Sequence, residues 1–292
     1  MNFSSEQNNR KGILLLLLAV ATFSSMDAVA KALVETYPAT QVVWIRFVGQ
    51  LALVGVILRH RLISQVRTDY PVMHLFRSAF QFGATTFFFL SLTHIGLTEA
   101  TAIADINPML ITLGAALFLG ERLTRARVVG VIVSALGALI VIRPGSDVFS
   151  LAAILPLLCA LSYAASALMT RYIGSKESPW ASMFYASVFG TIVAGAALPF
   201  VWVPITGGDL WLFVLVGCLG TVAQLALIRA YSVAEAAAIA PYSYAGIFFA
   251  STYSLIFFGV FPDWITLGGI LVIVASGLYV WSQEQPARGA AE

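Results

Sequence analysis

The sequence is poor in charged residues. Only 10% of its 292 residues are Asp, Glu, Lys or Arg, whereas 60% are hydrophobic. A soluble domain usually carries about 25% charged residues, so this composition excludes an ordinary soluble domain and indicates a membrane protein. The formal net charge is only +2. A nucleic-acid-binding domain is expected to be strongly basic, so we expect no nucleic-acid partner.

Cysteine and histidine are also scarce. The two cysteines, Cys159 and Cys218, both lie in apolar runs, and there are three histidines, so neither a disulfide framework nor a metal site is indicated. The chain carries no His-Glu-x-x-His or Gly-x-Ser-x-Gly motif and no nucleotide-binding loop. We therefore expect no cofactor and no metal, and transport would have to draw its energy from gradients.

Ten apolar segments are long enough, or nearly so, to cross a bilayer, which takes about 20 helical residues. They predict an all-α membrane protein with ten transmembrane helices. The first segment begins like a secretory signal peptide, but its apolar character continues through Leu33, so we expect a retained helix. The segments cover residues 12–33, 40–58, 71–92, 99–119, 128–142, 150–170, 180–200, 210–230, 236–259 and 264–281.

Lysine and arginine are unevenly distributed between the ends of these segments. If the amino terminus is cytoplasmic, thirteen fall on the inner side and only Lys31 and Arg143 on the outer side. Because cytoplasmic loops are enriched in such residues, we predict a multi-pass protein of a bacterial-type inner membrane with both termini cytoplasmic. The thirteen are Arg10, Lys11, Arg59, Arg61, Arg67, Arg77, Arg122, Arg125, Arg127, Arg171, Lys176, Arg229 and Arg288.

The two halves of the sequence resemble each other. Residues 99–104 (EATAIA) match residues 235–240 (EAAAIA) at five of six positions, and residues 118–130 align with residues 257–269. A duplication of this kind predicts two copies of one five-helix unit. Because five is odd, the second copy must cross the membrane in the opposite direction, which is the inverted-repeat architecture of many secondary transporters.

We place the two repeats at residues 1–145 and 146–292. The last helix of each carries small residues seven positions apart, which allow close helix packing and predict that these two helices pair as scaffold. These small residues are Gly130 and Gly137 in the first repeat and Gly269 and Ser276 in the second.

Three stretches of the first half resemble the EamA type of the drug/metabolite transporter superfamily: "INPMLITLGAALFLGE" (106–121), "VVWIRF" (42–47) and "MDAVAKAL" (26–33). The resemblance covers essentially the whole chain and implies two five-helix repeats and secondary transport. It also implies a metabolite substrate, since members export amino acids and other metabolites and some bacterial relatives import nucleotide-like or methyl-donor metabolites. The second repeat departs from the pattern: Val260 replaces the Glu of Gly-Glu, and Pro241 lies earlier in its helix than Pro108.

Three charged residues are predicted to share one layer inside the membrane. At 1.5 Å per residue, Asp27, Arg46 and Asp105 all lie roughly 9 Å below the outer surface. A structural salt bridge would explain them, and Asp27 and Lys31 are also spaced for a local helical pair. The alternative is a binding site or outer gate, because ionisable groups in membranes pair or line water-filled cavities. The equivalent positions of the second repeat carry no charge and favour the alternative: Ala165, Ser187 and Pro241.

Further polar residues fall near the middle of the predicted helices. Amide side chains cannot easily satisfy themselves within one helix, whereas hydroxyls often bond to their own backbone. Prolines remove a backbone donor and serve either as hinges or as passive bends. The candidate substrate-binding residues are Asp27, Arg46, Gln81, Thr85, Asp105, Asn107, Tyr163, Gln224, Tyr242 and Tyr244, and the candidate hinges are Pro108, Pro156 and Pro241.

These features favour a secondary-active transporter of small polar metabolites, with an amino acid moving outward by alternating access as the leading hypothesis. A zwitterion would place its carboxylate near Arg46 and its ammonium near Asp27 or Asp105. The expected partners are this small molecule, the lipid bilayer and protons. The alternatives are an importer or exchanger of a larger metabolite, a channel, and an intramembrane enzyme.

Overall fold

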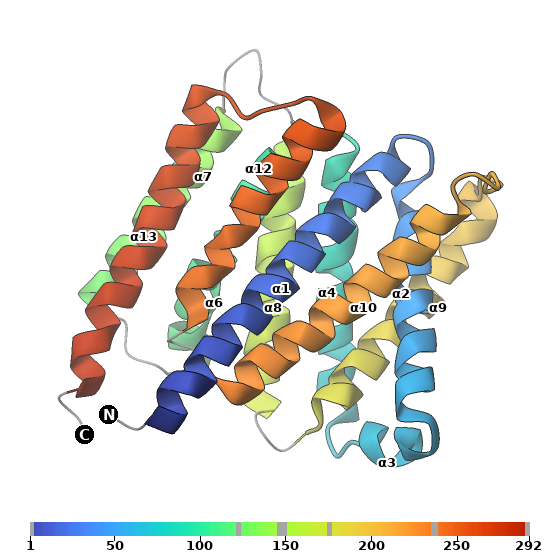
Figure 1. The fold of residues 1–292 in the computed structure, drawn as a ribbon, viewed down its shortest axis with the longest axis horizontal. Helices are drawn as coiled ribbons and strands as arrows, with labels where there is room; N and C mark the ends of the chain where they lie inside the picture. Colours follow the sequence, from blue (N-terminus) through green and yellow to red (C-terminus); the bar gives the residue numbers. More distant parts are fainter. Residues whose placement is uncertain (1–2, 121–123, 145–150, 174–176, 235–238, 290–292) are drawn as a thin grey trace.

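The computed structural model is a bundle of helices (Figure 1) and describes residues 3–120, 124–144, 151–173, 177–234 and 239–289. Within these residues there is no strand, so the all-α class is confirmed. The first half contains α1 (Phe3–Val34), α2 (Ala39–Leu58), the 3₁₀ helix η1 (Arg59–Arg61), α3 (Leu62–Val66), α4 (Pro71–Leu92), α5 (Leu97–Ala104), α6 (Asn107–Leu119) and α7 (Arg125–Ile142). The second contains η2 (Leu151–Ala153), α8 (Ile154–Ile173), α9 (Pro179–Val201), α10 (Leu210–Val233), η4 (Ala240–Tyr244), α12 (Ala245–Phe258) and α13 (Trp264–Gly289).

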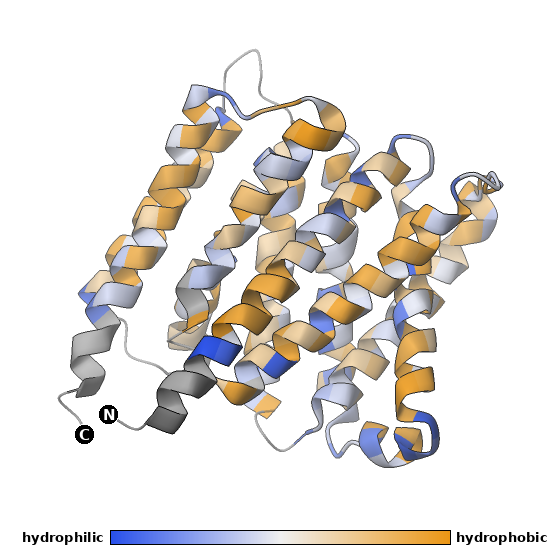
Figure 2. Cartoon of the chain, viewed as in Figure 1, coloured by the Kyte–Doolittle hydropathy of each residue, from blue (hydrophilic) through white to orange (hydrophobic). Residues whose placement is uncertain are grey.

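Eight helical stretches of the described residues are long and apolar enough to cross a bilayer. The helix α4 has the length but carries polar residues, and α12 has only 14 residues and continues from η4. With these two the bundle has the ten predicted crossings. Figure 2 shows apolar residues along the sides of the helices and hydrophilic ones mainly at their ends and in the connections.

The helix α1 begins, and α13 finishes, at the same end of the bundle (Figure 1), as an even number of crossings requires. We call this the terminal end and the opposite one the distal end. Two glutamates of the sequence motifs lie outside the described residues: Glu121 of Gly-Glu, and Glu235 of the repeated hexapeptide, the counterpart of Glu99.

The fourth crossing is broken, which the sequence segment 99–119 did not predict. The helix α5 ends at Ala104, a turn at Asp105 and Ile106 follows, and α6 begins at Asn107 with Pro108 in its first turn. Proline has no N–H to offer the carbonyl four residues earlier, here that of Ala104, and its ring crowds that carbonyl. The proline therefore places Asp105 at a helix end inside the bundle, where backbone groups are also free to bind.

The equivalent crossing of the second half is irregular at the same place. Pro241 lies in the 3₁₀ helix η4, and a regular α-helix, α12, starts only at Ala245. Pro156 differs from these two prolines, because it is the third residue of α8. A proline in the first turn costs no intrahelical hydrogen bond, so Pro156 interrupts no helix.

The helix packing is the same when the two halves are exchanged. The pairs α1–α10 and α8–α4 are equivalent under this exchange, as are α1–α12 and α8–α6, and α2–α10 and α9–α4; all six form contacts. The helices α2 and α9, and likewise α7 and α13, pack against their own counterparts. A pseudo-two-fold axis through the bundle produces this pattern, so the two five-helix repeats are inverted as predicted.

The helices α7 and α13 pack closely through their small residues. A Cβ added to Gly137 would lie only 2.8 Å from Ile273 and 3.0 Å from the carbonyl oxygen of Gly269. One turn away the hydroxyls of Ser134 and Ser276 are hydrogen-bonded. The predicted pairing of these two helices through small residues is confirmed.

The crossing of α2 and α10 depends on two glycines that meet face to face. A Cβ on Gly49 would lie 2.7 Å from Cα of Gly217, whereas one on Gly55, also in α2, would meet nothing within 4 Å. Alanine is the better helix former by about 1 kcal/mol, but overpacking costs about 1–3 kcal/mol. We expect Gly49→Ala to lower the thermal unfolding temperature in detergent and Gly55→Ala to leave it unchanged or raise it. Equal shifts for the two variants would contradict the packing argument.

Candidate substrate site

A small polar cavity lies where the two repeats meet. Its walls come from α2 and α4 of the first repeat and from their counterparts α9 and α10 of the second. Three predicted site residues line it: Arg46, Gln81 and Gln224. The full lining is Arg46, Phe47, Gln50, Arg77, Gln81, Met183, Ala186 and Gln224.

Arg46 is buried on α2, with only 6% of its surface exposed. Its Nη1 donates to the hydroxyl of Thr85 (2.9 Å) and its Nε to the sulfur of Met26 (3.4 Å). The guanidinium also lies 5.2 Å from the ring centre of Phe47 and 6.0 Å from that of Phe89, positions in which the aromatic face attracts a cation. All of these partners are neutral. Within the described residues Arg46 forms no salt bridge, so the structural ion pair considered above is absent from this structure.

The two acids of the predicted layer lie near each other and near the arginine. Asp27 interacts electrostatically with both Arg46 and Asp105. One carboxylate oxygen of Asp105, Oδ2, is buried and has no hydrogen-bond partner among the described residues. Lys31 does not pair locally with Asp27; its ammonium donates to the Leu92 carbonyl at the end of α4 (2.7 Å). The depth argument thus predicted which charges meet but not how each is satisfied.

The remaining predicted residues lie around the break in the fourth crossing or away from the cavity. Tyr163, on α8, is near both Arg77 and Asp105, and Tyr244 is near Asp105. Asn107 is half-buried at the start of α6, and Tyr242 is 41% exposed. Neither of these last two lines the cavity.

The sequence analysis missed two cavity residues, Gln50 and Arg77. It counted Arg77 only among the charges of the inner side, although the predicted segment 71–92 contains it; α4 begins at Pro71 and places this residue in its second turn, 8% exposed. A signal was present: Arg77, Gln81 and Thr85 are four residues apart, and such a spacing puts polar side chains on one face of a helix.

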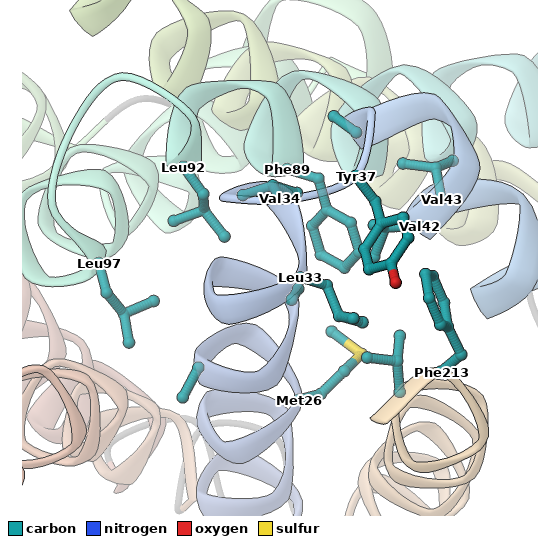
Figure 3. Packing of buried hydrophobic residues seen from close by; sticks show 14 of the residues in the cluster. Met26, Leu33, Val34, Tyr37, Val42, Val43, Phe89, Leu92, Leu97 and Phe213 are labelled. Atoms are coloured by element: carbon teal, nitrogen blue, oxygen red, sulfur yellow. The ribbon is translucent and has the colours of Figure 1, made fainter. Parts of the chain in front are cut away.

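Hydrogen bonds tie the two repeats together at the distal end. The hydroxyl of Tyr37 donates to Asp209 (2.7 Å) and accepts from the Thr206 amide (3.1 Å), while the Gln41 side chain bonds both backbone groups of Val203. The hydrogen bonds from Thr206 and Tyr37 lower the pKa of Asp209. Below these contacts lies an apolar plug (Figure 3), which includes Met26, Leu33, Tyr37, Phe89, Leu92 and Phe213.

The terminal end is tied in an equivalent way. Glu177 Oε1 accepts from the hydroxyl of Thr68 (2.9 Å) and the amide of Asp69 (3.0 Å), and Oε2 lies 3.4 Å from His74 Nε2. Burial alone would raise the pKa of Glu177, but the hydrogen bonds from Asp69, Thr68 and His74 lower it overall. Glu177 lies two residues before Pro179 in the connection between α8 and α9, and Thr36 lies two residues before Pro38 in the equivalent connection between α1 and α2. In each repeat, the connection between the first two helices thus closes one end of the bundle.

An ion pair at the distal end supplies a pH-dependent prediction. Asp263 accepts hydrogen bonds from Arg143 and, as the cap of α13, from the Thr266 amide, and the Arg143 bond lowers the pKa of Asp263 to about 2. A lowered folded-state pKa adds stability that is complete above about pH 4 and is lost as the pH falls towards 2. The carboxylate is 54% exposed, so solvent screening keeps this contribution below about 1 kcal/mol. We expect the unfolding temperatures of wild type and Asp263→Asn to differ slightly at pH 6 and to converge below pH 3. A difference that grows in acid would contradict this assignment.

Ten crossings in two inverted repeats, with a polar cavity between the repeats and a closure at each end, define a membrane carrier. A solved crystal structure has the same fold, with a TM-score of 0.66 and 19% identity over 95% of this chain and 98% of its own.

Residues 10–143 and 150–282 each match the EamA-like transporter family, and the chain belongs to this family of the drug/metabolite transporter superfamily. It is 31% identical to the pseudopaline exporter of Pseudomonas aeruginosa, over 91% of this chain and 94% of that protein. It is 32% identical to a riboflavin transporter of Rhizobium johnstonii (94% and 91%) and 26% identical to an S-adenosylmethionine uptake transporter of Rickettsia felis (94% and 94%). The chain is thus a transporter of small-molecule metabolites and not an enzyme.

Proposed function

We propose that this transporter exports an amino-acid-like metabolite, a zwitterion that bears a carboxylate, by alternating access. The observation that supports this most is Arg46: a buried cation on the cavity wall whose hydrogen-bond partners are all neutral and which Asp27 approaches electrostatically without a salt bridge among the described residues. A buried charge is costly unless it is paired, and a guanidinium fork matches a carboxylate. Asp27, which interacts electrostatically with Arg46 and Asp105, provides negative charge for the ammonium.

The cavity has room for only about one water molecule in this structure, so it must widen before it can admit any substrate. The relatives named as riboflavin and S-adenosylmethionine transporters favour a second candidate, an importer or exchanger of a larger metabolite, which would need this cavity to widen further. The exporter relative favours outward movement.

We propose that protons drive export. Chains of carboxylates inside membranes serve as proton relays in pumps and transporters, and Asp105 has a buried, unsatisfied oxygen beside Asp27. The test uses purified protein in liposomes with labelled amino acids, riboflavin and S-adenosylmethionine, with and without an imposed pH gradient. We expect amino-acid flux that follows the gradient in wild type and ignores it in Asp105→Asn. Flux of only the larger molecules would support the second candidate, and gradient-independent flux in wild type would refute proton coupling.

The terminal end is proposed to face the cytoplasm of a bacterial cell. Without the buried Arg77, twelve Lys and Arg residues remain on this side against two on the other, and the positive-inside rule sets orientation accordingly. In a cysteine-free background, a cysteine at Ser64 should be shielded from an impermeant maleimide added to intact cells, whereas one at Gly207 should react. The reverse pattern would invert the topology.

A further inference from the structure

The cavity contains two guanidinium groups and no carboxylate. Arg77 enters it from α4, and Arg46 from α2. The other polar residues of its lining are the amides Gln50, Gln81 and Gln224. Two positive charges therefore share one cavity, and both come from the first repeat.

Arg77 resembles Arg46 in having only neutral partners. Its Nε donates to the hydroxyl of Thr170 (2.8 Å) and its Nη1 to the carbonyl oxygen of Ser182 (2.9 Å). In the described part of the chain no acid forms an ion pair with it. These two bonds engage Nε and Nη1 and hold the guanidinium between α8 and α9, so Nη2, which has no hydrogen-bond partner among the described residues, is left for a ligand.

Two buried cations in one cavity are expensive to desolvate. One monocarboxylate can neutralise only one of them. A ligand with two carboxylates neutralises both, because Nη2 of each guanidinium can donate a charge-assisted hydrogen bond to one carboxylate. The amides can bind the neutral part of the ligand by donating and by accepting.

We propose that the substrate carries two carboxylates, one bound by Arg46 and one by Arg77, and so belongs to the amino-dicarboxylic acids. This inference rests on the proposed function and narrows it. Arg77 then discriminates between substrates of similar shape, because a neutral amide in place of the second carboxylate leaves its charge unpaired.

The test compares L-glutamate with L-glutamine, which have nearly the same shape and differ by one charge. Binding to purified protein in nanodiscs is measured by calorimetry for wild type and three variants. We expect glutamate to bind wild type at least about tenfold tighter than glutamine, a difference of about 1.4 kcal/mol. Arg77→Gln should abolish this preference by weakening glutamate binding, and Arg46→Gln should weaken both ligands.

Thr170→Val is the structural control, since it removes a partner of Arg77 but keeps the charge, and should keep the preference. Equal binding of both amino acids to wild type would overturn the second carboxylate site and leave the proposed function standing. If neither glutamate nor glutamine bound to wild type, the second carboxylate site and the proposed function would both be overturned. Inorganic phosphate that competes as well as glutamate would show a general anion site and also refute the inference. The wild-type comparison decides the matter even if Arg77→Gln does not fold.

Discussion

Arg46→Gln is expected to reduce transport by about a hundredfold without unfolding the protein. Hydrogen bonds to a charged group contribute about 1.5–3 kcal/mol, and about 2.8 kcal/mol corresponds to a hundredfold. Stability should change little, because the substitution removes a buried cation that has only neutral hydrogen-bond partners and forms no salt bridge among the described residues. Uptake by liposomes and thermal unfolding are measured on one preparation.

Two further variants separate the roles of charge and contact. Arg46→Lys keeps the charge without the planar fork, and should fall between wild type and Arg46→Gln. Thr85→Val removes the protein partner of the guanidinium but not the guanidinium, so it should cost about tenfold or less, as expected for one hydrogen bond. If Arg46→Gln lowered the unfolding temperature strongly while each folded molecule transported normally, Arg46 would be a packing residue.

Weakening the closure at one end of the bundle should open the cavity at that end, so variants at the two ends should have opposite effects on access. Tyr37→Phe removes the hydroxyl that binds Asp209 and Thr206 at the distal end, and Glu177→Gln weakens the contacts at the terminal end. A net loss of about 1.4 kcal/mol of hydrogen bonding at one end shifts the equilibrium between the two facing states of the transporter tenfold. We expect Tyr37→Phe to open the cavity distally and Glu177→Gln to open it at the terminal end.

The measurement uses a reporter cysteine at Ala186, on the cavity wall, in a protein lacking Cys159 and Cys218. An impermeant maleimide is added to one side of oriented liposomes at a time. Tyr253→Phe is the matched control, since its hydroxyl bonds Ser25 between α1 and α12 and touches neither closure. Labelling that rises on the same side for both variants would show that these contacts do not control access.

Most of the fold follows from the sequence because membrane crossing imposes a simple rule. Each crossing needs a long apolar helix, and the apolar segments predicted ten of them together with the inverted duplication. Pro108 indicated that the helix would be disturbed near Asp105. The form of the break depends on which backbone hydrogen bonds the neighbouring helices can replace, and only the tertiary structure shows this.

The site was predictable only in part. Counting depth along helices indicated that Asp27, Arg46 and Asp105 would meet, because rise per residue is fixed. Depth gives no rotation about the helix axis, so the bond from Arg46 to Thr85 did not follow from it. Arg77 was missed for a related reason: the segment 71–92 contained it near its inner end, but neither its depth nor its sequence position shows that its side chain turns towards the cavity.

The exchange symmetry of the helix contacts has a thermodynamic consequence. If turning the bundle inside out replaces each apolar contact by its counterpart, the bulk of the packing energy cancels between the two facing states. The energy difference between the two states is then set by the few positions at which the repeats differ in chemistry. Examples are Arg46, whose equivalent in the second repeat is Ser187, and Asp105, whose equivalent is Pro241. A handful of substitutions can reverse the resting orientation of such a scaffold, which gives a physical reason why proteins named as exporters and as uptake transporters share it.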